Sequence, residues 1–118
     1  MRVLVLAITA LFFNCAAIAA PATIKVIGPK VSCGAWVSER RLNSVKYREM
    51  EFWVMGFVSG WAEAWSDAQK LPTDPLRSID KDGAVEWITR YCGAHPLDQL
   101  TDALIGLVIE IESRQKSN

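Results

Sequence analysis

The chain has 118 residues, which is enough for one compact domain but not for two. Its 13 Lys and Arg balance 13 Asp and Glu, so the formal net charge at pH 7 is zero. Binding to nucleic acid or to an anionic membrane usually depends on a basic patch, and the composition supplies no basic excess for one. We therefore expect no nucleic-acid partner.

Residues 1–19 have the three parts of a secretory signal peptide: a basic second residue, an apolar run from Val3 to Phe13, and the A-x-A pattern of Ala17 and Ala19. The apolar run is shorter than the roughly 20 residues that a membrane span needs. We expect Sec-type export to the periplasm, cleavage after Ala19 and no stable membrane insertion afterwards. A retained anchor and a lipid attached at Cys15 are the alternatives.

Two cysteines, Cys33 and Cys92, remain after cleavage. The periplasm is oxidising, so an even pair in an exported chain is most simply a disulfide. The chain-entropy model assigns a loop of this length about 4 kcal/mol of stabilisation. Two buried free thiols are the alternative.

The order of helices can be read along the rest of the chain. Residues 20–31 form an extended lead-in, and Ser32 can cap a short helix from Cys33 to about Leu42. A long helix from about Val45 to Ala68 follows. Its apolar residues recur three and four positions apart, as a buried helical face requires: Tyr47, Met50, Val54, Phe57, Val58, Trp61 and Trp65.

Two further helices complete the domain. Two prolines within residues 71–78 place a loop there. Asp80 can cap a third helix that ends near Gly93. The fourth helix runs from about Leu97 to Arg114, with Leu97 already in its apolar stripe. The sequence therefore predicts an all-α, four-helix domain over residues 32–118, held by one disulfide.

Small residues interrupt the long helix at Gly56, Ser59 and Gly60. Each glycine inside a helix costs about 1 kcal/mol relative to alanine, so we expect a compensating contact. We predict close packing of the third or fourth helix against these residues. Insertion of a partner into the same groove is the alternative.

Aromatic residues are frequent on the same helix, and they span more than one of its faces. Part of this aromatic surface is therefore expected outside the core, where it would contact a client protein or a second copy of the chain. Core packing is the alternative. The residues predicted for client or dimer contact are Phe52, Trp53, Phe57, Trp61 and Trp65.

Groups that could perform catalysis are few. His95 is the single histidine, and its place before Pro96 favours a turn or capping role over a role as base or metal ligand. The separation of Cys33 and Cys92 excludes a C-x-x-C redox motif and a compact zinc knuckle. We expect no enzymatic activity, no cofactor and no metal.

Two segments around the cysteines resemble a known family. Residues 32–36 read Ser-Cys-Gly-Ala-Trp, which is similar to a Ser/Thr-Cys-x-x-aromatic opening. Residues 91–96 read Tyr-Cys-Gly-Ala-His-Pro, which is similar to Tyr-Cys-x-x-Asn-Pro with His95 in place of Asn. Both patterns are those of the HdeA/HdeB periplasmic acid-stress chaperones. The resemblance covers about residues 32–100.

The resemblance implies a small helical domain with a Cys33–Cys92 bridge, folded and often dimeric near neutral pH. In acid it implies a loosened domain that binds denatured clients through newly exposed apolar surface. Protonation of 13 carboxylates would leave the Lys and Arg uncompensated, and these number 12 once Arg2 is subtracted from 13. Their repulsion would open the packing.

A second resemblance supports a different function. Residues 56–60, Gly-Phe-Val-Ser-Gly, and the later Tyr91, His95-Pro96, Ala103 and Leu107 also look like exported immunity proteins of type VI secretion systems. That resemblance implies a specific inhibitor that neutralises one toxin. An exported structural or phage-associated domain is the third alternative.

Overall fold

The computed structural model describes residues 26–117. They form four helices and contain no β-strand: α1 (Cys33–Arg41), α2 (Val45–Gln69), α3 (Lys81–Ala94) and α4 (Leu100–Lys116). The predicted all-α, four-helix fold is therefore confirmed. The expected signal peptide and the first part of the lead-in, residues 20–25, lie outside the described residues.

Polar side chains fix the start of three helices. Ser32, Ser44 and Asp80 each accept a hydrogen bond from the backbone N–H three residues further along, at 3.2, 2.9 and 2.7 Å respectively. These bonds satisfy N–H groups that have no partner within the helix. The caps at Ser32 and Asp80 were predicted from the sequence. Helix α2 ends at Gln69, and its C-cap Lys70 adopts a left-handed conformation.

Helix α4 begins later than the sequence predicts. Leu97 is 91% exposed and lies in the turn before the helix, so its assignment to the apolar stripe was wrong. The carbonyl groups of this turn serve α1 instead: Asp98 accepts from Cys33 N–H at 2.8 Å, and Pro96 accepts from Gly34 N–H at 3.0 Å. A helix that started at Leu97 could not offer both bonds.

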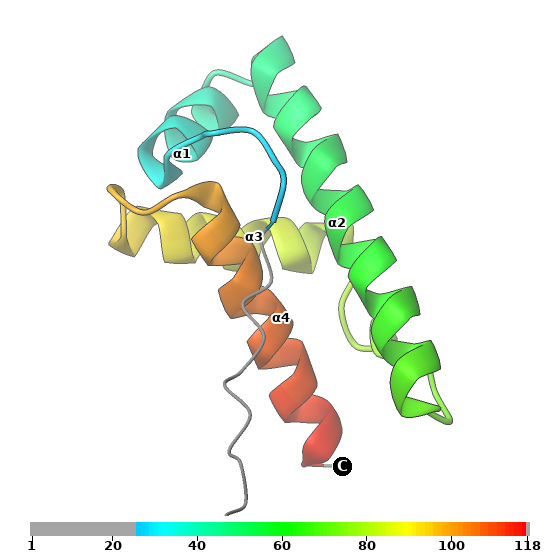
Figure 1. Cartoon of the computed structure of the whole chain (residues 1–118). Coiled ribbons are helices and arrows are strands. Elements are labelled where there is room, and N and C mark those ends of the chain that lie inside the picture. The colour runs from blue at the N-terminus through cyan, green and yellow to red at the C-terminus, as the bar shows by residue number, and fades with distance from the viewer. Residues whose placement is uncertain (1–25, 118) are drawn as a thin grey trace, which may run out of the picture.

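Helices α1, α3 and α4 pack on one another, and α2 packs against two of them. Helix α1 packs on α3 and α3 on α4, whereas α2 packs against α1 and α4. Figure 1 shows α2 and α4 running side by side in the same general direction, with α3 crossing behind the upper end of α4 and the lead-in curving between α2 and α1. The apolar side chains with the least exposure form one core; the largest are Trp36, Val54, Ile88, Leu100, Leu104 and Leu107.

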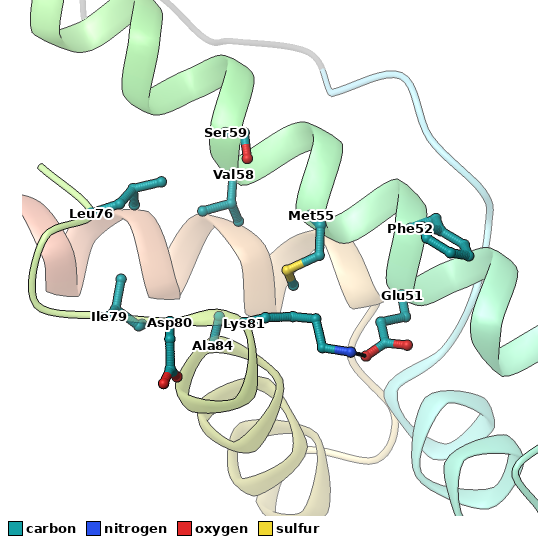
Figure 2. A pocket seen from close by; sticks show the side chains of 10 residues that line it. All are labelled: Glu51, Phe52, Met55, Val58, Ser59, Leu76, Ile79, Asp80, Lys81 and Ala84. Atoms are coloured by element: carbon teal, nitrogen blue, oxygen red, sulfur yellow. Dashed lines mark ion pairs between the residues drawn. The ribbon is translucent and has the colours of Figure 1, made fainter. Parts of the chain in front are cut away.

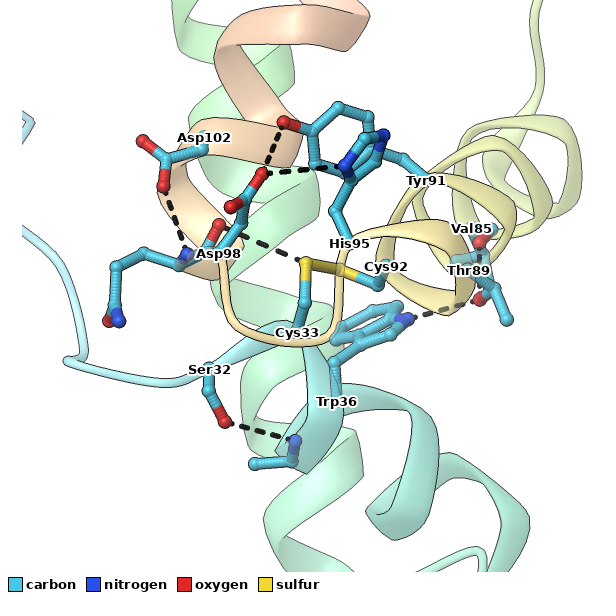
Figure 3. The surroundings of a disulfide bond; sticks show 12 residues. Ser32, Cys33, Trp36, Val85, Thr89, Tyr91, Cys92, His95, Asp98 and Asp102 are labelled. Carbon is cyan, nitrogen blue, oxygen red and sulfur yellow. Dashed lines mark hydrogen bonds and ion pairs between the residues drawn. A yellow bond between two sulfur atoms is a disulfide. The ribbon is translucent and has the colours of Figure 1, made fainter.

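The predicted disulfide is present between Cys33 and Cys92, with both residues fully buried. It connects the first residue of α1 to the last turn of α3 (Figure 3). Trp36 reinforces the same junction, because its indole N–H donates to the Thr89 hydroxyl at 3.0 Å. The Thr89 hydroxyl in turn donates to the Val85 carbonyl at 2.8 Å.

Replacing Cys33 by Ser should lower the free energy of unfolding by about 4 kcal/mol, because the unfolded chain regains the freedom of a long loop. Urea unfolding at pH 7, followed by circular dichroism, measures the change. A reducing agent should weaken the wild-type domain to the same extent and leave Cys33→Ser unchanged. An unaltered unfolding midpoint in the variant would show that the disulfide is not a main source of stability.

Candidate functional site

Helix α2 borders two apolar grooves, one on each side. The first, the α2–α3 groove, has a volume of about 440 Å³ and lies between α2, the loop after it and the start of α3. Figure 2 shows Met55 and Val58 of α2 facing Leu76, Ile79 and Ala84 across it. Its apolar lining could hold an apolar segment of another molecule.

An ion pair spans one end of the α2–α3 groove. Lys81 Nζ lies 3.0 Å from Glu51 Oε1, joining the start of α3 to the second turn of α2. The hydrogen bond to Glu51 and the attraction of its carboxylate raise the pKa of the Lys81 ammonium. This pair depends on the charge of a carboxylate, so it is a contact between α2 and α3 that acid removes.

The second groove, the α2–α4 groove, has a volume of about 610 Å³ and lies on the opposite side of α2. Side chains from the lead-in, α2 and α4 form it, and none of them is charged. Its apolar character is therefore uninterrupted. The lining residues are Val26, Gly56, Phe57, Gly60, Trp61, Ile105 and Val108.

The five aromatic residues predicted for client or dimer contact do not form one surface. Phe52 is 77% exposed and lines the α2–α3 groove. The other four follow one another at intervals of four residues and stack in pairs, with ring centroids 5.9 Å apart for Trp53 and Phe57 and 5.3 Å apart for Trp61 and Trp65. Phe57 and Trp61 line the α2–α4 groove.

The lead-in covers one of these rings. A Cβ added to Gly28 would overlap the Trp53 ring, since it would lie only 2.6 Å from the Cη2 atom, closer than van der Waals contact allows. The backbone at Gly28 therefore lies directly on the indole, where only glycine fits. Trp53 is half-buried as a result, and Phe57 and Trp61 are the members of the aromatic row that face the open groove.

The predicted packing of another helix against Gly56, Ser59 and Gly60 was wrong. All three residues are exposed, and a Cβ added to either glycine would meet no atom within 4 Å. The separation of α2 from α4 leaves this stretch uncovered. The glycine that permits close helix packing is Gly106 of α4, where an added Cβ would lie 3.0 Å from Cη2 of Trp87 on α3.

Sequence reasoning missed the residues that α4 contributes. Ile105 and Ile109 are 42% and 61% exposed, and Ile105 lines the α2–α4 groove. The sequence pattern could have indicated them, because Ile105 and Ile109 lie about 100–140° around α4 from Leu104, which belongs to the buried stripe. An apolar run that continues beyond the core stripe indicates a second apolar face.

The turn at His95 is structural, as predicted. His95 is the C-cap of α3, and its N–H donates to the Tyr91 carbonyl at 2.9 Å. The Tyr91 hydroxyl donates to Asp98 Oδ2 at 2.9 Å, and this bond raises the pKa of the Tyr91 phenol.

Burial raises the pKa of the Tyr47 phenol in the core.

Residues 26–117 lack two features. No group of three or more His, Cys, Asp and Glu side chains there could hold a metal ion. No helix there is long and apolar enough to cross a membrane.

Comparison with known proteins finds no matching family model, no matching curated protein and no matching solved structure. The grooves of α2 are therefore the basis for any functional assignment.

Gly56→Ala and Gly60→Ala should each raise the free energy of unfolding by about 1 kcal/mol, because alanine favours the helix and meets no neighbour. Gly106→Ala is the matched control and should gain less or lose stability, since Trp87 must move. Chemical unfolding of the three variants measures the difference. Equal gains at all three positions would contradict the packing described for Gly106.

Proposed function

We propose that this chain is an exported protein-binding domain that acts in the periplasm as an HdeA/HdeB-like acid-stress chaperone, limiting aggregation of denatured clients. One observation carries the proposal: apolar grooves lie on both sides of α2, and α2 is the long helix outside the disulfide junction. A helix placed in this way can separate from the rest of the domain and expose apolar surface.

Acid weakens the attachments of α2 in particular. An ion pair on a protein surface contributes at most about 1 kcal/mol, so no single pair controls the fold. Acid, however, protonates all the carboxylates together, and two of the pairs between helices involve α2. The pairs between helices are Lys81–Glu51 at 3.0 Å (α3–α2), Lys46–Glu39 at 3.8 Å (α2–α1) and Arg40–Glu86 at 3.2 Å (α1–α3).

The covalent bond between Cys33 and Cys92 is unaffected by protonation, so α1 stays attached to α3 in acid. Repulsion among the remaining positive charges then acts on the weaker contact, which is the one around α2. Movement of α2 would uncover its buried stripe, including Met50, Val54 and Val58. This surface would join the grooves in binding denatured clients.

A second function is favoured by a separate observation. The α2–α4 groove is open in the folded structure, with Gly56 and Gly60 exposed at its edge. A protein that binds one toxin, as immunity proteins do, needs such a preformed site at neutral pH. The two functions differ in specificity and in pH dependence.

The test of the chaperone function is light scattering of an acid-labile client brought to a pH of about 2–3, with and without the oxidised domain. We expect the domain to suppress scattering in acid and to be inactive with the same client heated mildly at pH 7. Failure to suppress aggregation in acid, by a domain that remains folded there, would rule out the chaperone and favour a dedicated partner.

A further inference from the structure

The α2–α4 groove has the shape and lining of a helix-binding site. It is apolar and lies between two neighbouring helices, with side chains of Phe57 and Trp61 on one wall and Ile105 and Val108 on the other. A helix that presents an apolar stripe can place its side chains between two such walls.

Gly56 and Gly60 allow a partner's backbone to approach this groove closely. They lie one helical turn apart, and the space beside each is open to at least 4 Å from an added Cβ. Side chains at these positions would fill the approach. The cost of two helical glycines, which no contact with residues 26–117 offsets, is therefore explained if a partner helix packs there.

Acidic residues continue the same face of α2 beyond both ends of the groove. Glu49 lies seven residues before Gly56, and Glu63 lies seven residues after it, so all three lie on nearly the same side of the helix. Both glutamates are exposed, and neither forms an ion pair with another described residue, although Glu63 also borders a pocket between α2 and residues 74–76. Asp67 follows one turn later and pairs with Lys70.

The basic residues of α2 near Glu49 have partners before the groove: Arg48 donates to the Asn43 carbonyl at 3.2 Å, and Lys46 is paired with Glu39. Lys116 is the last residue of α4. Lys30 lies in the lead-in and lines a neighbouring pocket that shares Val26 with the groove. The charges that flank the glycines on α2 are thus Glu49 and Glu63, about 21 Å apart at 1.5 Å per residue.

We infer that the α2–α4 groove binds, at neutral pH, an amphipathic helix of another protein whose apolar stripe is bordered by Lys or Arg residues about 14 positions apart. The uncharged groove receives the stripe, and Glu49 and Glu63 attract the two basic ends. This inference rests on the proposed protein-binding function, but it concerns the folded domain at pH 7 and not the acid-opened state.

A second copy of the chain fits this face less well. In an antiparallel pairing centred between Gly56 and Gly60, residue 49 of one copy would face residue 67 of the other. Glu49 would then oppose Asp67, which is already paired with Lys70, so this contact would offer Glu49 no uncompensated basic charge. A basic partner helix meets the same two ends with opposite charge.

The probe is a synthetic helical peptide of about 18 residues with a Leu and Ala stripe and Lys at the two bordering positions; the matched peptide carries Glu there. Fluorescence anisotropy of the labelled peptides with the oxidised chain at pH 7 and low salt measures binding. We expect the Lys peptide to bind at least about tenfold more tightly than the Glu peptide, and added salt to reduce this preference.

Variants locate the site. Gly60→Leu should abolish binding by filling the open space, whereas Gly60→Ala should leave a measurable affinity. The double variant Glu49→Lys, Glu63→Lys should reverse the preference toward the Glu peptide. Circular dichroism confirms that each variant is folded, which the exposure of all three positions favours.

Four results would overturn the inference. The first is equal affinity for the two peptides, and the second is binding that survives Gly60→Leu in a folded domain. The third is a dimer in sedimentation that Gly60→Leu abolishes while neither peptide binds. The fourth is peptide binding that appears only after Ile24→Asp weakens the apolar character of the segment before Val26. The last two would assign the groove to a second copy or to the chain's own N-terminal segment. None of the four bears on aggregation in acid, which tests the chaperone separately.

Discussion

The bond between Cys33 and Cys92 lies where α1 begins and α3 ends, and backbone hydrogen bonds beside it fix a further segment to the same place. Cys33 and Gly34 donate to the carbonyl groups of Asp98 and Pro96, so the turn into α4 is held against the start of α1. Three of the four helices therefore meet at one covalently closed junction. Helix α2 is attached by side-chain packing and by ion pairs at its edges, and this difference makes it the element that can bind partners on both sides.

The grooves follow from that construction. Because α2 and α4 make few contacts, apolar residues that a tighter bundle would bury remain at the groove surface, among them Ile105 and Phe57. Phe52 and Met55 border the other side of α2, where the loop after α2 and the start of α3 leave the α2–α3 groove open. An open groove is costly for an isolated domain, since apolar area stays in contact with water. Binding of protein on either side would recover part of that free energy, at neutral pH through the preformed groove and in acid through the wider surface that movement of α2 would expose.

Sequence reasoning succeeded where the cause is local and failed where it depends on how helices cross. Serine and aspartate caps, the two prolines and the three-and-four spacing place four helices almost at their observed ends. The start of α4 was missed because Leu97 fits the apolar spacing, yet the turn's carbonyls are committed to Cys33 and Gly34. The role of the glycines was missed because sequence gives no crossing geometry: Gly106 lies under Trp87, whereas Gly56 and Gly60 face open space. For the same reason the sequence could not show that Phe52 lines one groove and that Phe57 and Trp61 line the other.

Hydrogen exchange compared between pH 7 and a pH of about 3, with intrinsic rates corrected for pH, tests most directly whether α2 is the separable element. The account predicts that amides of α2 lose protection in acid, while those of α1 and α3 near Cys33 and Cys92 keep more of theirs. Loss of protection in all four helices together, or an α2 that stays as protected as α3, would contradict it.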